Sequence, residues 1–248
     1  GKELPVFGID GKAPCEITVK STRPDHVYEP LYTSDDFNYT PDADGKVRLK
    51  KVWQWNHTPI EGLWSVTERP GAYRIRSGKI SPNMVLAANT LTQRMMGPAC
   101  EGIVTVDASA INDGDYAGIC ALQGIYGFIA ITREEGKYYL VMVAKEEDPS
   151  EGLWGPPGGD QKPGKEMVRV PLDGPIATLK VKANFVNSID EVEFFYKEGE
   201  EWVKLGPTHK LKYKLDHFCG CRFGLFLFST KVTGGVADFM HFVYNILE

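Results

Sequence analysis

Aromatic and amide side chains gather in one stretch of this chain, between residues 53 and 94. The stretch opens with Trp53-Gln54-Trp55-Asn56-His57, continues through Trp64, and closes with Asn89-Thr90-Leu91-Thr92-Gln93-Arg94. Indole rings offer flat apolar surface to the C–H faces of a sugar, while amide, imidazole and guanidinium groups bond its hydroxyls. The residue types therefore predict a carbohydrate-binding surface. The alternative is that the tryptophans fill a hydrophobic core, where aromatic residues are equally common.

The alternation of side chains along a strand limits which of these residues can share a surface. Trp53 and Trp55 lie on one face of an extended segment and Asn56 lies on the other. Both faces cannot line one groove, so we expect Trp53 to belong to the core. Gln93 and Arg94 also point in opposite directions, so at most one of them should contact a sugar directly.

The residues that we expect to bind sugar come from this stretch and from a later one. They are Trp55, Asn56, His57, Trp64, Gln93, Arg94, Asp115, Tyr116, Gln123 and Tyr126. A role for His57 as a metal ligand or an acid–base group is disfavoured, because no cluster of partner residues accompanies it.

Two acidic residues permit a second interpretation, which is catalysis. Glu191 and Glu193 face the same side of an extended segment, and Phe195 takes the next position on that face. A pair of carboxylates on either side of a glycosidic bond can hydrolyse it. The simpler interpretation is that both carboxylates form the solvated face of a strand.

Length and composition indicate a globular protein and exclude several classes of function. The chain has 248 residues, of which 42% are hydrophobic and 25% charged, enough for a sizeable core. A net charge of −5 argues against a surface for nucleic acid or for an anionic membrane. No apolar run reaches membrane-spanning length, and the first residues do not form a signal peptide.

The cysteines do not suggest a disulfide framework, because there are five of them. They are Cys15, Cys100, Cys120, Cys219 and Cys221. The pair Cys219 and Cys221 lacks the further ligands that a zinc site needs. We therefore expect buried or unreactive thiols.

Short strands bounded by turn residues account for most of the chain. The expected strands cover 71–76, 103–107, 116–132 (two strands with a tight reversal), 138–144, 167–172, 178–185, 191–197, 202–206, 222–229 and 236–245. Residues 148–164, rich in glycine and proline, should form a surface loop. No segment has the period of an amphipathic helix over three turns. The pattern predicts an all-β fold, a two-layer antiparallel β-sandwich.

Residues 1–32 differ in character from the rest of the chain, because proline and glycine punctuate them and no apolar period is sustained. We expect a linker or a tail there, and one β-sandwich domain over residues 33–248.

Several motifs, in order along the chain, resemble one family. They are Trp53-Gln54-Trp55-Asn56-His57, Trp64-Ser65-Val66-Thr67-Glu68-Arg69-Pro70-Gly71, Asn89-Thr90-Leu91-Thr92-Gln93-Arg94, Asp113-Gly114-Asp115-Tyr116-Ala117-Gly118, Tyr126-Gly127 and Arg222-Phe223-Gly224-Leu225-Phe226. Together they resemble the C-terminal concanavalin A-like sandwich, a jelly roll, of family 43 glycoside hydrolases of the β-xylosidase type. Residues 1–32, with Gly8-Ile9-Asp10-Gly11, resemble the end of a preceding catalytic propeller or its connecting segment.

The resemblance implies that this chain carries no catalytic residue. In that family two Asp and one Glu in the five-bladed propeller perform hydrolysis with inversion. The chain would then be an accessory module that binds xylan or xylo-oligosaccharides. The alternative is a purely structural sandwich that completes the active-site entrance of a β-xylosidase propeller. A module that binds polymer would be secreted or at the cell surface, whereas part of an oligosaccharide-processing xylosidase would be cytoplasmic.

The resemblance also implies a structural calcium. In many concanavalin A-like sandwiches a cation ties the first strand to the last through carboxylates and carbonyl oxygens. Asp36 and Asp238 are the matching pair, with Asp35 in reserve. The alternative is two solvated carboxylates.

Overall fold

The computed structural model describes residues 20, 22–155, 160–215 and 219–247. The chain divides into two units, Gly1–Pro30 and Leu31–Glu248. The described part of the first unit is exposed and contains neither strand nor helix. The boundary expected after residue 32 lies close to this division. The motif Gly8-Ile9-Asp10-Gly11 and Cys15 lie outside the described residues.

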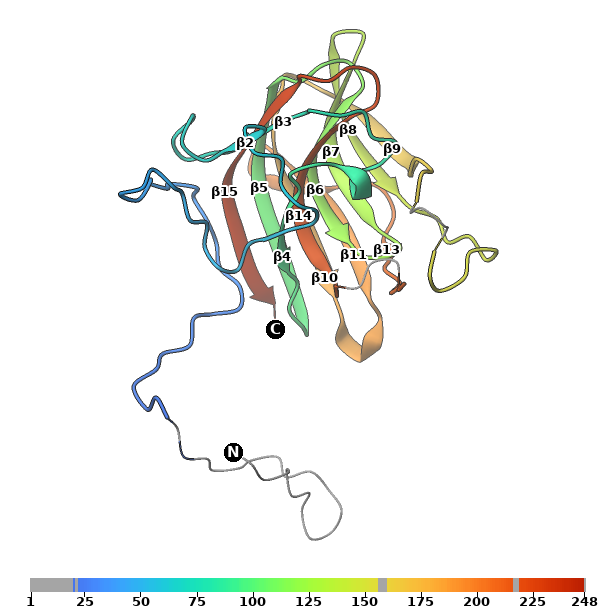
Figure 1. The fold of residues 1–248 in the computed structure, drawn as a ribbon. Helices are drawn as coiled ribbons and strands as arrows, with labels where there is room; N and C mark the ends of the chain where they lie inside the picture. Colours follow the sequence, from blue (N-terminus) through green and yellow to red (C-terminus); the bar gives the residue numbers. More distant parts are fainter. Residues whose placement is uncertain (1–19, 21, 156–159, 216–218, 248) are drawn as a thin grey trace, which may run out of the picture. The chain divides into compact units, whose positions relative to one another are not determined.

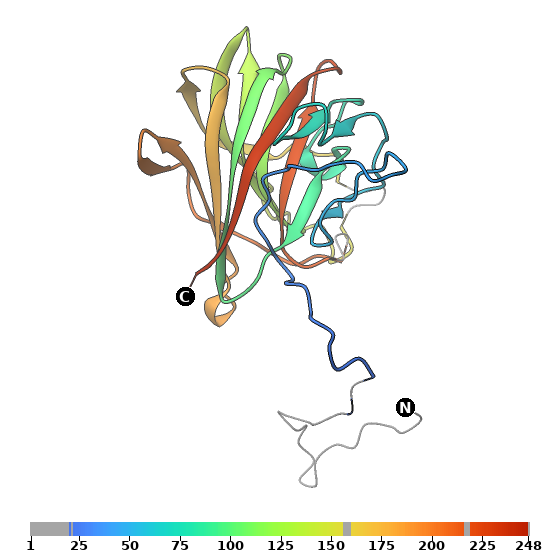
Figure 2. The ribbon, with the colours of Figure 1, turned by 90° about the vertical axis from the view of Figure 1, so that its left-hand side faces the viewer.

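The second unit is built from two antiparallel sheets (Figure 1). One sheet has seven strands in the order β1 (Gln54–Trp55), β4 (Leu91–Arg94), β14 (Arg222–Ser229), β6 (Asp115–Leu122), β7 (Gly127–Glu134), β8 (Lys137–Ala144) and β9 (Lys165–Leu172). The other has eight, in the order β12 (Glu201–Lys204), β11 (Glu191–Glu198), β10 (Ile176–Asn184), β5 (Ala99–Ala110), β15 (Val236–Leu247), β3 (Tyr73–Arg76) and β2 (Trp64–Ser65), with β13 (His209–Lys210) beside β11. In Figure 2 the long strands β10, β5 and β15 run side by side.

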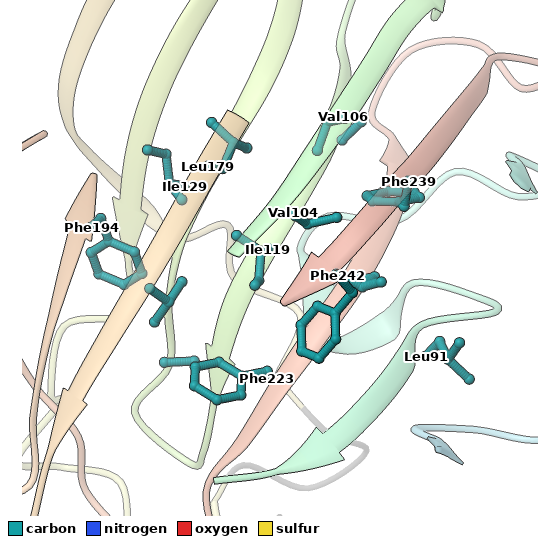
Figure 3. Close-up of a cluster of buried hydrophobic side chains, with 14 of the residues drawn as sticks. Leu91, Val104, Val106, Ile119, Ile129, Leu179, Phe194, Phe223, Phe239 and Phe242 are labelled. Atoms are coloured by element: carbon teal, nitrogen blue, oxygen red, sulfur yellow. The ribbon is translucent and has the colours of Figure 1, made fainter. Parts of the chain in front are cut away.

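The main hydrophobic core lies between the two sheets, because each strand alternates between inward and outward side chains. Val104 and Val106 of β5 face Ile119 of β6 and Ile129 of β7 across this layer (Figure 3). All four side chains are buried. The apolar residues of the alternating pattern thus point inward and form the core between the two sheets.

A second apolar cluster covers the outer face of the seven-stranded sheet. It contains Cys120, Phe128, Phe226 and Phe228 from the strands, and Met84 from the short 3-10 helix η1 (Met84–Leu86). Burial on both faces explains why β6, β7 and β14 are almost continuously apolar. This face therefore combines a covered part under η1 with a more exposed part farther along the sheet.

The prediction of an all-β antiparallel sandwich is confirmed. Over the described residues there is no α-helix, only η1 and η2 (Val186–Ser188) of the 3-10 type. The expected strands all occur, and β14 has the expected bounds. The extended segment expected around Trp53–Asn56 contains the two-residue strand β1, whereas the expected strand ranges did not include β2, β4 or β13. No helix in the described part of the chain has the length and apolar character needed to cross a membrane.

Candidate functional site

Trp53, Trp55 and Trp64 pack against the main core of the sandwich. Trp53 is buried in the main core, as expected, and its indole N–H donates to a carboxylate oxygen of Asp35 at 2.7 Å. Trp55 and Trp64 are half-buried, pack against the same core, and contact each other with ring centroids 5.0 Å apart. Because β1 and β2 are edge strands of opposite sheets, this contact joins the sheets along one side.

Asn56 and His57 hold a neighbouring segment of the chain. The side-chain amide of Asn56 donates to the carbonyl oxygen of Val85 at 3.1 Å, and Nε2 of His57 lies 2.6 Å from the same oxygen. Val85 belongs to η1, which covers the outer face of the seven-stranded sheet. Both residues therefore position η1, and these polar atoms are already engaged.

Gln93 and Arg94 point in opposite directions, as expected from their spacing. Gln93 is fully buried and bonds the backbone of Thr33 twice, accepting from its N–H at 2.7 Å and donating to its carbonyl at 3.0 Å. Arg94 is exposed. The expectation of direct sugar contact thus does not fit Gln93, and Arg94 is the member of the pair that reaches solvent.

Three further predicted residues lie inside the protein. Asp115 and Tyr126 are fully buried, and Gln123 is 4% exposed. Asp115 accepts the backbone N–H of Asn112 at 2.8 Å, while Gln123 accepts the backbone N–H of Gly124 at 2.9 Å. The direct sugar contacts expected of these three residues do not fit this placement, because a surface glycan cannot reach them.

Tyr116 does lie at the surface, and it has a second tyrosine near it. The strand registers place Phe228, Tyr116, Thr132 and Tyr139 in one row across β14, β6, β7 and β8. Side chains in one row share a face, and here it is the outer face of the seven-stranded sheet. Tyr116 and Tyr139 are both half-buried, and Tyr116 stacks on Phe228 at 5.0 Å.

An arginine from β9 completes this surface. The guanidinium carbon of Arg169 lies 5.0 Å from the ring centroid of Tyr139. Arg169 donates two hydrogen bonds of 2.8 Å to Glu166 and one of 2.7 Å to Glu134. These bonds, led by those to Glu166, raise the pKa of Arg169, so it stays cationic. We name Tyr116, Tyr139, Arg169, Glu134 and Glu166 the tyrosine–arginine platform.

The platform combines the two features that recognise sugars. Its rings give apolar surface, and a fixed guanidinium with two carboxylates gives donors and acceptors. Sequence reasoning included Tyr116 but missed the other four residues. Tyr139 and Arg169 share a face because β8 pairs with β9 and sets Val141 opposite Arg169, and nothing in the sequence alone revealed this pairing or the row that joins β8 to β6.

Trp64 lines a shallow groove. Its walls are Gly45, Lys46 and Val47 on one side and Glu61 with residues 64–67 on the other, and its volume is about 500 Å³. The indole Nε1 of Trp64 is buried and has no hydrogen-bond partner among the described residues. Trp64 is therefore the tryptophan that combines a core contact with a groove.

The two carboxylates considered for catalysis are not arranged as an acid–base pair. Glu193 forms an ion pair with Lys204, with Oε1 2.6 Å from Nζ. The hydrogen bond from Lys204 is the largest cause that lowers the pKa of Glu193. A general acid in glycoside hydrolysis needs a raised pKa. Glu191 lies opposite Lys210 in the neighbouring strand. These surroundings suit a solvated strand face.

Asp238 is held by arginines. Its Oδ1 accepts from Nε of Arg74 at 2.7 Å, and its Oδ2 accepts from Arg74 at 2.8 Å and from Arg69 at 2.7 Å. Arg69 also donates to Asp107 at 2.7 Å. These ion pairs join β3, β5 and β15 at the place where a cation was expected.

Asp36 and Asp35 have other partners. Asp36 is exposed, and hydrogen bonds from Asn38, chiefly from its side chain, lower the pKa of its carboxyl. Asp35 is buried and accepts from Trp53 and from the hydroxyl of Tyr39. Within the described residues no three His, Cys, Asp or Glu side chains come together as a metal-binding group. Calcium at this place stays a prediction, and the described partners of Asp238, Asp36 and Asp35 are those of the protein itself.

The cysteines within the described residues are free thiols, and two of them are buried, as one of the two expectations for them had it. Cys100 and Cys120 are buried, Cys219 and Cys221 are half-buried, and all four are free. Burial is the main cause that raises the pKa of Cys221 to about 11.

Comparison with known proteins places these features in a family. Residues 42–245 match the family of β-xylosidase C-terminal concanavalin A-like domains. A β-xylosidase of Formosa agariphila is 25% identical over 236 residues, covering 86% of this chain and 35% of that protein. A putative β-xylosidase of Xylanibacter ruminicola is 31% identical over 76 residues, covering 31% of this chain and 14% of that protein. The chain thus spans a minor part of these relatives.

Solved structures agree with the family match. A bifunctional GH43-CE protein of Bacteroides eggerthii superposes with a TM-score of 0.80 at 33% identity, covering 100% of this chain and 30% of that one. A GH43 glycoside hydrolase engineered to display both endo-xylanase and exo-arabinofuranosidase activity gives a TM-score of 0.79 at 25% identity, covering 98% of this chain and 46% of that one.

Proposed function

The chain belongs to the family of β-xylosidase C-terminal concanavalin A-like domains, and from this membership we propose that it is a non-catalytic accessory module of a family 43 glycoside hydrolase that binds xylan or xylo-oligosaccharides. The relatives are longer than this chain, which covers 35% of the Formosa agariphila β-xylosidase. A catalytic propeller domain in the same polypeptide is the partner we propose. Such a module would be secreted or at the cell surface if it holds polymer.

The observation that supports sugar binding is the tyrosine–arginine platform. Tyr116 and Tyr139 lie in one row of the sheet, and Arg169 is fixed over Tyr139 by two carboxylates. Exposed ion pairs of this kind add little to stability, so their value here is orientation of donors and acceptors. A β-linked glycan chain presents apolar faces and hydroxyls in alternation, which suits rings and charges along a strand row.

The platform can be tested by affinity gel electrophoresis in xylan and by calorimetric titration with xylohexaose. Arg169→Gln should weaken binding about tenfold, because an interaction of about 1.4 kcal/mol with a charged donor is lost. Arg48→Gln is the matched control, since the side chain of Arg48 is 83% exposed and lies outside the platform. Trp64→Ala tests whether the groove beside Trp64 contributes instead.

A purely structural sandwich is the second candidate, and a specific observation favours it. Asn56, His57 and Gln93, expected to touch sugar, bond the backbone of Val85 and Thr33 instead. If the wild-type chain shows neither retardation in xylan nor heat with xylohexaose, the structural role replaces the binding role. Equal affinities of Arg169→Gln and wild type would show that the platform does not bind the sugar.

A further inference from the structure

A groove at the end of the sandwich is distinct from the platform and from the Trp64 groove. It has a volume of about 760 Å³ and lies between the end of β8 and the segment that contains β13. One wall carries residues 144–147, the other residues 209–213, and Ile125, Met167 and Asp190 complete the lining. A polar pocket of about 400 Å³ shares residues 145–147 with it. This size is typical of ligand sites.

One residue that lines the groove, Lys145, is a buried cation held in an ion-pair network. Lys145 is 7% exposed, and its Nζ lies 3.0 Å from Asp160 and 3.4 Å from Glu151. Lys214, also buried, lies 2.9 Å from the same Glu151 oxygen. Burial of charges is costly unless they are paired in good geometry, so this network holds its members in place. The network therefore fixes Lys145, a residue that lines both the groove and the neighbouring polar pocket.

The charges that line the groove balance one another. The cations are Lys145, Lys210 and Lys212, and the anions are Glu146, Glu147 and Asp190. Burial lowers the pKa of His209, which keeps its imidazole neutral near pH 7. Lys212 forms an ion pair with Glu147, and Lys165 forms one with Glu146 at 2.6 Å. A balanced lining does not select an ion, but its ammonium and carboxylate groups can donate to and accept from hydroxyls.

Apolar surface lies beside these charges. Tyr213 is 45% exposed and Met167 is 37% exposed, and both line the groove together with Ile125 and Leu211. A ring and a thioether next to paired charges suit a ligand with apolar C–H faces and many hydroxyls. A charged peptide or a nucleic acid would lack a complementary field here.

We infer that this groove is a second binding site, which takes a short neutral oligosaccharide with one sugar ring on Tyr213. The inference rests on the proposed function, because that function makes xylo-oligosaccharides the sugars that the module binds. It adds a site at the end of β8, where sequence reasoning placed no binding residue. Short oligosaccharides would use the groove, while a polymer would also use the platform.

The test is a calorimetric titration of the chain with xylotetraose. Tyr213→Ala should weaken binding about tenfold, equivalent to an aromatic contact of about 1.4 kcal/mol. Tyr28→Ala is the matched control, because Tyr28 is 86% exposed and lies in the other unit. Glu147→Ala, a change at a surface ion pair, should also weaken binding. A tetramer of uronic acids should bind no tighter than xylotetraose, since the lining is balanced in charge.

The outcomes separate this inference from the proposed function. The groove would be overturned if Tyr213→Ala and Glu147→Ala kept the wild-type affinity for xylotetraose while Arg169→Gln lost affinity for xylan. The module function would then still stand. Retardation of the wild-type chain in xylan gels, without any heat of binding to xylotetraose, would also overturn the groove and leave the module function standing. Failure of the wild-type chain to bind either sugar would overturn both. Melting temperatures equal to wild type show that the variants are folded.

Discussion

Trp55 and Trp64 touch across the open side of the sandwich, with ring centroids 5.0 Å apart and planes inclined by 58°. Trp55 belongs to the edge strand of one sheet and Trp64 to the edge strand of the other. Trp55 also lies 6.3 Å from the buried ring of Tyr73. The residues that looked most like a sugar site thus hold the two layers together.

This contact predicts a loss of stability in Trp55→Ala. Removing a half-buried indole should lower the free energy of unfolding by about 2–4 kcal/mol, since large aromatic deletions in cores cost about 3–5 kcal/mol. Trp154→Ala is the matched control, because Trp154 is 74% exposed. Its change should stay within about 0.5 kcal/mol. Urea unfolding measures both, and equal losses would contradict the role given to Trp55.

The arginine network predicts that Asp238 matters more than Asp36. Asp238→Ala leaves Arg69 and Arg74 without their shared carboxylate, and should lower the free energy of unfolding by about 1–3 kcal/mol. The expected loss is modest because the side chain of Arg69 is 38% exposed and water screens its charge. Asp36→Ala, at an exposed carboxylate, serves as control. A larger loss in Asp36→Ala would show that the network does not join the strands.

Calcium is tested by the melting temperature with calcium and with the chelator EGTA. Both oxygens of Asp238 accept hydrogen bonds from guanidinium groups, so an ion would have to displace them. We therefore expect equal melting temperatures in the two conditions. A ligand that binds the folded state alone raises the melting temperature. A rise with calcium that Asp36→Ala and Asp238→Ala abolish would restore the calcium site.

Asp115 predicts a pH dependence of stability. Burial is the main cause that raises the pKa of its carboxyl above the ordinary value of 3.8. Between that value and the raised one, the folded state binds more protons than the unfolded state, so this group's contribution to stability falls as pH rises. In Asp115→Asn the amide keeps an acceptor for the N–H of Asn112 and does not titrate.

Urea unfolding over a series of pH values checks this sign. The stability of Asp115→Asn relative to wild type should increase as pH rises above about 4, where the unfolded carboxyl ionises. A difference that stays constant with pH, or that shrinks as pH rises, would contradict the raised pKa. Other carboxyls titrate in both proteins, so the difference isolates Asp115.

We expect Glu191 and Glu193 of β11 not to hydrolyse glycosidic bonds. Glu193 is bound to Lys204 and its pKa is lowered, which is the wrong direction for a general acid. Wild type, Glu191→Gln and Glu193→Gln should all release negligible reducing sugar from xylan and from mixed-linkage glucan. Turnover in wild type that either substitution abolishes would reinstate the sandwich-enzyme interpretation.

The fold could be predicted from sequence because its signals are local. Strand β14 is an almost continuously apolar run between turn residues, and the hairpin of β7 and β8 turns at Glu135 and Gly136, both with positive φ. Strand β4 was missed, because Leu91–Arg94 contains three polar residues. Two of these, Thr92 and Gln93, are buried and satisfied by partners far away in sequence.

The site was harder to predict for a physical reason. Whether a polar side chain serves a ligand or its own chain depends on long-range pairing. Gln93 bonds Thr33, and Asn56 bonds Val85, partners that no spacing reveals. Arg169 joins Tyr139 only because β8 pairs with β9 in a register that sets Arg169 opposite Val141, two residues from Tyr139. Tyr116 was found because its motif is local.

The proposed module holds a xylan-type sugar and breaks no glycosidic bond. One calorimetric titration of the 248-residue chain with xylohexaose, followed by an assay of reducing ends in the same cell, tests both halves of this statement together. We expect a saturable heat of binding and an unchanged number of reducing ends. Release of shorter sugars, or the absence of any heat of binding, would contradict the proposal.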